Sequence, residues 1–579
     1  MQFTRFSSTY SQNLKSKEVI VLTRGFVDPD VTVCLHSYHH FQKEGMMSTR
    51  SRTLVVTFVT IGLALSVSTF FAFAIDENVF TYATYQESMT CDPAKSVDET
   101  EVAIVLNAYD PLVYPVKGAA PKPWVAESWE VSESGLEYVF KIREGIKFHD
   151  GSDLNAEDVV FSMKRMLQIN QGFSWLWNEI LEPDDVEMTG TYEVTFHLNK
   201  LFGPFIATLV QFNVVNKDLV MANKKPGDYG EFGDFGQEYL ETQDAGSGAY
   251  IIDSVTLGDT VIFTKFDEYW HGWEPGQLDK VIWRVIPERA TMDILLKKGD
   301  VDMIDQWGTP EEYEELAATE GVMVQEDPNV MLYLHQINNQ RAPFDDINVR
   351  KAVCYAFDYE TALRDIFYGA AQAEGPVPIL LPGHSDNVTV YHQDLEKARE
   401  FLASSKYSAA ELEDMELIYV YVTGNELERK LGLLMMSNFA EIGLKVTLEK
   451  AVWGRMCDMA SKPETTPHFM AIYNGAKYPS PDMFTYTLFN PNAWGTFRSC
   501  SWYENEEVTE LTATARKTID TEERYALYIR AQEIITEDAA ALFIANPIHR
   551  IAMRDYVTGY DFCGINPFDL VFYNLKLDK

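Results

Sequence analysis

The stretch 126–166, AESWEVSESGLEYVFKIREGIKFHDGSDLNAEDVVFSMKRM, constrains the fold of this chain more than any other. Residues 138–142 place a large apolar side chain at every second position, which is the pattern of a half-buried strand. Gly145 and Gly151 supply turns because glycine adopts a positive φ without strain. Asn155 is placed to cap a helix whose acidic first turn suits the positive end of the helix dipole. The stretch therefore predicts strand, turn, strand, turn and helix, in that order.

The rest of the chain also alternates between strand and helix patterns. Its 579 residues exceed the size at which a single hydrophobic core stops growing, so two or more lobes are expected. Such alternation is typical of an α/β protein. We expect strands at 80–85, 193–198, 260–266 and 417–422, helices at 395–402, 431–442 and 520–535, and a surface loop at 223–236.

The N-terminal part carries a secretion pattern. Two arginines in 46–52 precede the apolar run 54–73, and Ala72-Phe73-Ala74 forms an A-x-A cleavage signal. This combination predicts a secretory signal peptide over 46–74, with an uncleaved membrane anchor as the alternative. Residues 1–45 are not explained by this pattern and are interpreted as a non-native extension ahead of the true start.

The charge of the chain excludes some partners. Its 87 acidic residues outnumber 48 basic residues, for a net charge of −39. A chain this acidic is poorly suited to binding nucleic acid or anionic lipid. With 46% apolar residues it is nonetheless too apolar to be disordered, so the charge is interpreted as an aid to solubility.

The sequence offers no catalytic or metal-binding motif. It has no H-E-x-x-H, no G-x-S-x-G, no phosphate-binding loop and no dinucleotide fingerprint. The histidines His335, His384 and His392 are scattered, and each is predicted to be a structural or surface residue. We therefore expect no catalytic residue, no metal site and no cofactor.

The cysteines after the signal peptide form no C-x-x-C pair. Because their number is odd, at least one thiol is free or paired between chains. Their spacing leaves the connectivity open among Cys91, Cys354, Cys457, Cys500 and Cys563.

Several motifs carry a family resemblance: AESWE at 126–130, FKIREG at 140–145, KFHDG at 147–151 and AEDV at 156–159. In this order they resemble the signature region of the family 5 solute-binding proteins of ABC transporters, a family of peptide, nickel and oligosaccharide receptors. The resemblance extends over about residues 80–575, through GSGAYI at 246–251 and GDVD at 299–302. Ala249 stands where the family usually has proline.

The resemblance implies an α/β fold of the periplasmic-binding-protein type, type II and cluster C-like. Such a protein has two large lobes with a hinge and a smaller inserted lobe, and it encloses its ligand when the hinge closes. The expected boundaries are 75–115, 246–330 and 546–579 for the discontinuous lobe I, 116–245 for the inserted lobe II, and 331–545 for lobe III.

The resemblance also implies a function. The protein would capture an extended solute, with oligopeptides as the leading class, and deliver it to the permease and ATPase subunits of an ABC importer at the inner membrane. It would be periplasmic and monomeric, and it would catalyse nothing. An oligosaccharide is the alternative ligand. A hydrolase on this scaffold, and a sensor or chaperone that presents its ligand to another protein, are the alternatives from other classes.

By the same resemblance, a small set of residues is expected to face the ligand. Trp453 lies ten residues after the Gly443 turn, at a position that faces the cleft in several branches of the family. Trp307 follows a strand at a position where family members line the pocket. The region around the P-D-x-F element supplies the other candidates, Tyr473, Asn474, Lys477 and Tyr478.

Two positions depart from the dipeptide-binding branch of the family. Where that branch holds the α-ammonium with an aspartate, five residues before the P-D-x-F aspartate, this chain has Lys477. Where that branch pairs an arginine with the α-carboxylate, this chain has Val422. A lysine facing a buried ammonium would be repulsive. Short peptides held by both ends are therefore disfavoured, whereas longer peptides, sugars stacked on Trp and Tyr, and an anionic ligand paired with Lys477 stay open.

Overall fold

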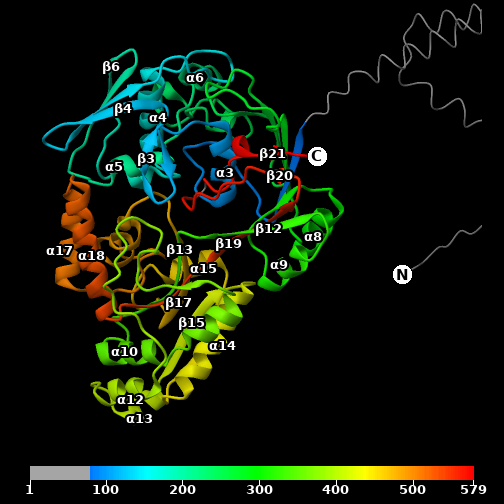
Figure 1. The fold of residues 1–579 in the computed structure, drawn as a ribbon. Helices are drawn as coiled ribbons and strands as arrows, with labels where there is room; N and C mark the ends of the chain where they lie inside the picture. The colour runs from blue at the N-terminus through cyan, green and yellow to red at the C-terminus, as the bar shows by residue number, and fades with distance from the viewer. Residues whose placement is uncertain (1–77, 567) are drawn as a thin grey trace, which may run out of the picture. The chain divides into compact units, whose positions relative to one another are not determined.

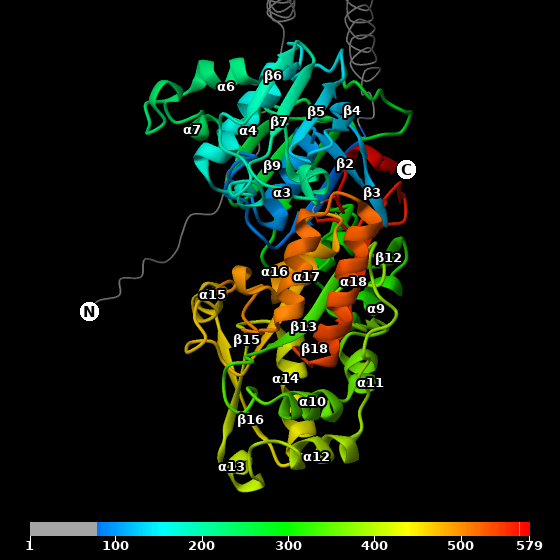
Figure 2. The same ribbon diagram turned by 90° about the vertical axis from the view of Figure 1, so that its left-hand side faces the viewer.

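The computed structural model describes residues 78–566 and 568–579, which belong to one compact unit. The predicted signal peptide at 46–74 and the extension at 1–45 lie outside the described residues. Three large sheets organise the unit (Figure 1, Figure 2). Two short strand pairs complete it, β2 (Val113–Val116) with β3 (Ala119–Pro123) and β20 (Val557–Thr558) with β21 (Lys576–Leu577).

The first sheet has seven strands in the order β12-β19-β11-β1-β10-β9-β8. Strand β1 is parallel to both of its neighbours, and the other pairs are antiparallel. Its strands are β1 (Val79–Thr84), β8 (Tyr250–Thr256), β9 (Thr260–Lys265), β10 (Lys280–Val285), β11 (Met303–Ile304), β12 (Val322–Pro328) and β19 (Ile548–Arg554). Helices α3 (Glu99–Ala108), α8 (Arg289–Lys298) and α9 (Pro310–Ala317) pack against it. This sheet thus collects strands that lie far apart in the sequence.

The second sheet has four antiparallel strands in the order β4-β5-β7-β6. They are β4 (Ala126–Val131), β5 (Glu137–Ile142), β6 (Val186–Gly190) and β7 (Glu193–His197). The alternate residues Tyr138, Phe140 and Ile142 of β5 are at most 2% exposed. Helices α4 (Ala156–Ile169), α5 (Phe205–Thr208), α6 (Lys217–Asn223) and α7 (Gln237–Leu240) belong to the same part of the chain.

Helix α4 begins where the sequence predicts. The side chain of Asn155 accepts from the backbone N–H of Glu157, and the side chain of Asp158 accepts from the backbone N–H of Asn155. The predicted order of strand, turn, strand, turn and helix is confirmed. The loop expected at 223–236 exposes residues 224–228, 230 and 231, whereas Phe235 is buried and its carbonyl accepts from Arg165 at 2.8 Å.

The third sheet has six strands in the order β14-β18-β13-β17-β15-β16. They are β13 (Met331–Ile337), β14 (Ala371–Gln372), β15 (Glu416–Val422), β16 (Lys445–Ala451), β17 (Phe469–Gly475) and β18 (Ala541–Asn546). The helices of this part are α10 (Ile347–Ala356), α11 (Tyr359–Thr361), α12 (Leu395–Ala403), α13 (Ala409–Asp414), α14 (Glu426–Ala440), α15 (Trp453–Met459), α16 (Tyr486–Phe489), α17 (Glu506–Lys517) and α18 (Thr521–Glu537). Figure 2 shows α17 and α18 packed side by side. The helix expected at 431–442 begins earlier, because Asn425 caps it by accepting from the N–H of Glu428.

The chain passes directly between the seven-stranded and six-stranded sheets twice, over very short connections. Strand β12 ends at Pro328 and β13 begins at Met331. Strand β18 ends at Asn546 and β19 begins at Ile548. Two adjacent, short crossings of this kind are typical of a hinge.

The glycines of the GSGAYI motif allow a close backbone approach. A Cβ on Gly246 would lie 1.8 Å from the carbonyl oxygen of Ala108, and one on Gly248 would lie 2.6 Å from the carbonyl carbon of Ala108. The N–H of Gly248 donates to the same carbonyl oxygen at 3.0 Å. Only glycine fits both positions, because any side chain would push the chain away from α3.

A buried ion pair joins α4 to the segment after β1. The two Nη atoms of Arg165 donate to the two carboxylate oxygens of Asp92, each at 2.6 Å. Both side chains are at most 1% exposed. Paired, bidentate geometry is what makes two buried charges tolerable.

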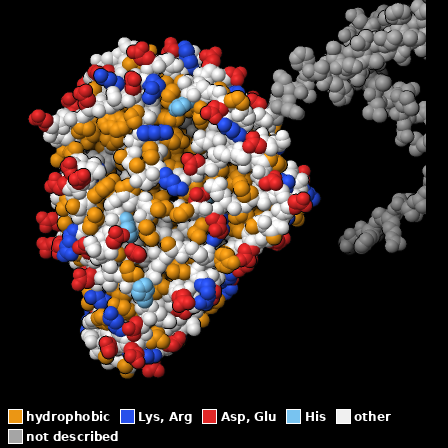
Figure 3. Space-filling model, in the orientation of Figure 1, with side chains coloured by type: hydrophobic (Ala, Val, Ile, Leu, Met, Phe, Trp, Pro, Cys, Tyr) orange, Lys and Arg blue, Asp and Glu red, His pale blue; other side chains and the backbone are white. Residues whose placement is uncertain are grey.

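Figure 3 shows Asp and Glu side chains spread over the face in view, between apolar and basic ones. Among residues 78–566 and 568–579, no helix is both long and apolar enough to cross a membrane. All five cysteines of this part are unpaired, with Cys91, Cys354 and Cys500 buried.

Candidate functional site

Both hinge connections border a cavity of about 650 Å³. The seven-stranded side contributes residues 305–310, which follow β11, and the six-stranded side contributes residues 422–427 and Tyr473. Trp307 is 43% exposed, so its indole ring is free to contact a ligand. The volume is in the range of pockets that bury most of a small ligand.

Four charged side chains form a cluster that we call the charged quartet: Glu99, Lys477, Arg498 and Asp569. Glu99 begins α3 and Asp569 lies in the C-terminal segment, whereas Lys477 follows β17 and Arg498 precedes α17. The other three charges all act on the pKa of Lys477. Within the described part of the chain, none of the four makes an ion pair shorter than 4.0 Å.

Burial disfavours the charged form of every member of the quartet. It raises the pKa of the Glu99 carboxyl, although the charge of Lys477 opposes this shift, and it raises the pKa of Asp569 to about 6. It lowers the pKa of the Lys477 ammonium, with the charge of Arg498 adding to the effect, and lowers the pKa of Arg498 to about 10. All four side chains nevertheless keep some accessible surface. Charged groups that are desolvated, unpaired and still accessible are typical of binding sites.

A hydrogen-bond relay through Tyr560, His549 and Gln306 holds the carboxylate of Glu99 in place. The hydroxyl of Tyr560 and Nε2 of His549 are 2.7 Å apart, and Nδ1 of His549 is 2.6 Å from Oε1 of Gln306. Since Oε1 only accepts, Nδ1 carries the proton and Nε2 accepts from the tyrosine. The amide nitrogen of Gln306 in turn donates to Glu99. Burial lowers the pKa of His549 to about 3, so the relay stays neutral and presents Glu99 as an acceptor.

Lys477 and Arg498 are each held by other neighbours. Nζ of Lys477 donates to Oδ1 of Asn566 at 2.7 Å. The guanidinium of Arg498 lies over the rings of Trp175 and Phe497, with its Cζ 5.4 and 5.1 Å from their centroids. Its Nε has no hydrogen-bond partner among the described residues. This Nε is buried, so the Nη end of the guanidinium is the part of Arg498 that could donate to an anion.

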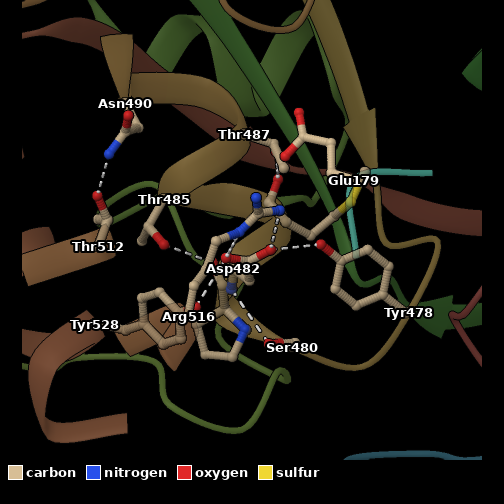
Figure 4. A network of polar contacts seen from close by, with 12 residues as sticks. Glu179, Tyr478, Ser480, Asp482, Thr485, Thr487, Asn490, Thr512, Arg516 and Tyr528 are labelled. Carbon is tan, nitrogen blue, oxygen red and sulfur yellow. Dashed lines mark hydrogen bonds and ion pairs between the residues drawn. The ribbon is translucent and has the colours of Figure 1, made fainter. Parts of the chain in front are cut away.

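The aspartate of the P-D-x-F element is buried in a network that fixes the loop carrying Lys477 (Figure 4). Nε and Nη2 of Arg516 donate to the two oxygens of Asp482 at 2.9 and 3.0 Å. The hydroxyls of Tyr478 and Tyr528 donate to the same carboxylate at 2.7 and 2.8 Å. Asp482 is 0% exposed. Its role in the described structure is to position the loop.

The six ligand-binding residues predicted from the sequence lie in several different parts of the structure. Trp307 and Tyr473 line the cavity of about 650 Å³, and Lys477 belongs to the charged quartet. Trp453 begins α15, is 45% exposed, and lies against the ring of Phe497 at 4.8 Å between centroids.

The remaining two predicted residues are buried. Asn474 is 1% exposed and its Nδ2 donates to the carbonyl of Met483 at 3.3 Å. Tyr478 is 0% exposed and its hydroxyl is bound to Asp482. Both support the loop in this conformation. A ligand-binding role stays a prediction for all six residues.

Sequence reasoning missed Glu99, Arg498 and Asp569. Nothing separates these residues from the other charged residues of the chain until the fold places them around Lys477. The only sequence signal is local: Asp98 caps α3 by accepting from the N–H of Glu101, which places Glu99 at the helix start.

Comparison with known proteins decides the family. A family model described as "Bacterial extracellular solute-binding proteins, family 5 Middle" matches residues 120–496, which is more than half of the chain. The chain belongs to this family.

Curated relatives of this family 5 protein match it over most of their lengths. The probable D,D-dipeptide-binding periplasmic protein DdpA of Escherichia coli K12 is 26% identical, over 87% of this chain and 94% of the relative. Heme-binding protein A of Haemophilus influenzae is also 26% identical, over 86% and 92%. Among solved structures, the ABC transporter-associated periplasmic binding protein DppA of Helicobacter pylori, in complex with the peptide STSA, is 25% identical with a TM-score of 0.72, over 86% of this chain and 98% of that one.

The comparisons confirm the resemblance to family 5 and the α/β fold of the periplasmic-binding-protein type. The family consists of extracellular solute-binding proteins. The boundaries predicted for lobes I, II and III stay a prediction.

Proposed function

We propose that this family 5 protein is the ligand-capturing component of an ABC importer and that its ligand is a peptide bound between the seven-stranded and six-stranded sheets. Two relatives with peptide or dipeptide in their printed names or titles support the ligand class. The observation that carries the proposal is the charged quartet, in which the charges of Glu99, Asp569 and Arg498 all act on Lys477 and none of the four forms an ion pair with any residue that the structure describes.

The quartet has the charges that the two ends of a peptide require. In this proposal Glu99, held by the Gln306 relay, accepts from the α-ammonium, and Asp569 adds negative charge nearby. The guanidinium of Arg498 donates to the α-carboxylate through its Nη end, and Lys477 adds positive charge. Charge-assisted hydrogen bonds of this kind are roughly twice as strong as neutral ones. In this proposal, the two terminal anchors that are absent at Lys477 and Val422 are supplied from other positions.

In this proposal, aromatic residues near the hinge contact the side chains of the peptide. Trp307 and Tyr473 line the cavity beside the quartet, and Trp453 with Phe497 lies on the side of Arg498. Aromatic rings provide contact area that tolerates many ligand side chains. Closure at the two short connections would then remove the ligand from water.

The same proposal includes the location and the partners of the protein. The chain would be exported by the segment 46–74, act as a monomer in the periplasm, catalyse no reaction, and pass its peptide to permease and ATPase subunits. An oligosaccharide remains the alternative ligand, but a neutral sugar would leave the four charges of the quartet desolvated without an ion-pair partner.

Isothermal titration calorimetry with dipeptides, tripeptides and longer peptides tests the proposal. Each peptide is compared with its N-acetylated and C-amidated forms, which lack one terminal charge. We expect free peptides to bind and each blocked form to bind at least tenfold more weakly. Glu99→Gln should remove the preference for a free N-terminus, and Arg498→Gln the preference for a free C-terminus.

Matched surface variants control for charge alone. Glu507→Gln and Arg530→Gln change an exposed ion pair and should leave both preferences intact. Binding of oligosaccharides with no binding of any peptide would contradict the proposal.

A further inference from the structure

A second polar cluster lies in the connection between β14 and α12, apart from the charged quartet. It consists of Glu374, His384 and Asp386, whose ligand atoms all lie within 4.8 Å of one another. Nε2 of His384 is 3.7 Å from an oxygen of Glu374 and 3.8 Å from an oxygen of Asp386. The sequence predicted His384 to be a structural or surface residue, because its partners are not adjacent in a recognisable motif.

The hydrogen bonding of His384 fixes which nitrogen faces the carboxylates. Nδ1 lies 2.8 Å from the carbonyl oxygen of Val377, which can only accept, so Nδ1 carries a proton. Nε2 is buried and has no hydrogen-bond partner among the described residues. The side chain is only 9% exposed, so water does not readily satisfy it. In its neutral form the ring aims an unused lone pair of Nε2 at two anionic groups.

This arrangement is unfavourable for a neutral imidazole alone but suits a cation. A metal-bound histidine characteristically donates its other ring N–H to a carbonyl or carboxylate, as Nδ1 does here to Val377. Zinc is bound by imidazole nitrogen and carboxylate oxygen at about 2.0–2.2 Å, in tetrahedral sites. Ligand atoms in such a site are separated by roughly 3.3–3.6 Å. The distances of 3.7 and 3.8 Å from Nε2 would shorten by a few tenths of an ångström, and the two carboxylate oxygens, within 4.8 Å of each other, would also move closer together.

The connection that carries the cluster is anchored to α18. The side-chain amide of Gln532 donates to the carbonyl of Gly383 at 2.8 Å, and the N–H of Thr389 donates to the hydroxyl of Thr536 at 3.0 Å. His384 is therefore held in place by both flanks. The carboxylates are more accessible, with Glu374 39% and Asp386 97% exposed, so an ion can enter from solvent.

We propose that Glu374, His384 and Asp386 form a binding site for a divalent transition-metal ion of the zinc class. The ion would take Nε2 of His384 and one oxygen from each carboxylate, and a water molecule would complete a tetrahedral set. Two carboxylates balance its charge. The site is independent of the peptide site and would tie Glu374, near the start of the connection between β14 and α12, to His384 and Asp386 further along it.

The test uses the purified chain, stripped of metal with EDTA and dialysed, and ZnCl₂ alone as the probe. Calorimetric titration should give one zinc ion per chain. Zinc at a hundredfold excess over Kd should raise the Tm by about 2–3 °C, and EDTA should reverse the shift. His384→Gln and Asp386→Asn should each abolish this binding. Asp386 is almost fully exposed, so its substitution leaves the fold intact and keeps the test decisive.

His197 offers a matched control. It also lies near two carboxylates, those of Glu137 and Glu187, but it is 42% exposed and its Nε2 already has a partner at 3.0 Å. His197→Gln should leave the zinc stoichiometry unchanged. Absence of zinc binding at 100-fold molar excess, or equal binding in wild type and Asp386→Asn, would overturn the proposal.

Discussion

At the residue scale, the protonation of Glu99 should control ligand affinity. Burial raises the pKa of this carboxyl, and a peptide ammonium favours its ionised form. Peptide binding therefore releases protons, and affinity should fall as the pH decreases through the raised pKa. The lowered pKa of Lys477 works in the opposite direction, because the lysine loses its charge as the pH rises. Calorimetry between about pH 5 and 9 should show that peptide affinity is highest near neutral pH.

The variant Glu99→Gln should flatten the acid side of this profile and leave the alkaline side in place. Glu507→Gln serves as the control and should keep both sides. Affinity that does not change with pH in the wild type would contradict the role assigned to Glu99.

Asp482 should be needed for the fold more than for ligand contact. Asp482→Ala leaves the Arg516 guanidinium and two tyrosine hydroxyls without their shared acceptor. Breaking one partner of a buried pair costs about 3–5 kcal/mol. Urea denaturation should show this loss in the free energy of unfolding, whereas Asp184→Ala at an exposed pair should change it by less than about 1 kcal/mol. Equal stability of both variants would show that the network contributes little.

The residues of the site were only partly predictable. The positions of Trp307, Tyr473 and Lys477 followed from the family pattern, and the structure places two beside the cavity and one in the quartet. Glu99 and Arg498 could not be found, because their surroundings arise from segments that are hundreds of residues apart. Tyr478 was predicted as a ligand contact, yet its hydroxyl is bound to Asp482 inside the protein.

At the scale of elements, helix α14 should contribute less to the stability of the fold as the pH rises. Glu428 is 2% exposed, and burial raises the pKa of its carboxyl to about 7, although the N–H of Val422 donates to it. A raised folded-state pKa means that the contribution to stability is complete below the unfolded pKa and is lost as the pH rises through about 7. The shift corresponds to roughly 3 kcal/mol between the two protonation states.

Glu428→Gln should therefore become more stabilising, relative to wild type, as the pH rises from about 5 to 8. Thermal unfolding of the two proteins at several pH values measures this difference. Glu426→Gln, at an exposed position of the same helix, should show no such trend. A constant difference in Tm between wild type and Glu428→Gln would contradict the assignment.

Local patterns predicted most elements, and their limits have physical causes. The alternation at 138–142 and the cap at Asn155 gave β5 and α4 because both signals lie within one element. The start of α14 was missed because its first turn is charged and only Asn425 marks it. Sheet order could not be read at all, since β1 lies between β10 and β11, which are about 200 residues further along the chain.

At the scale of the whole molecule, the two short connections predict a closing motion. Peptide bound between the seven-stranded and six-stranded sheets would be contacted from both sides only in a closed form. Small-angle X-ray scattering should show a smaller radius of gyration when a binding peptide is added, and no change with its N-acetylated, C-amidated form. An unchanged radius at saturating peptide would argue against hinge closure.

The most direct measurement is native mass spectrometry of the purified chain, followed by denaturation and identification of any released small molecule. We expect released masses that match peptides with free termini, present with wild type and depleted in Glu99→Gln and Arg498→Gln. A ladder of masses separated by hexose units, or an identical peptide yield from both variants, would contradict peptide capture by the charged quartet.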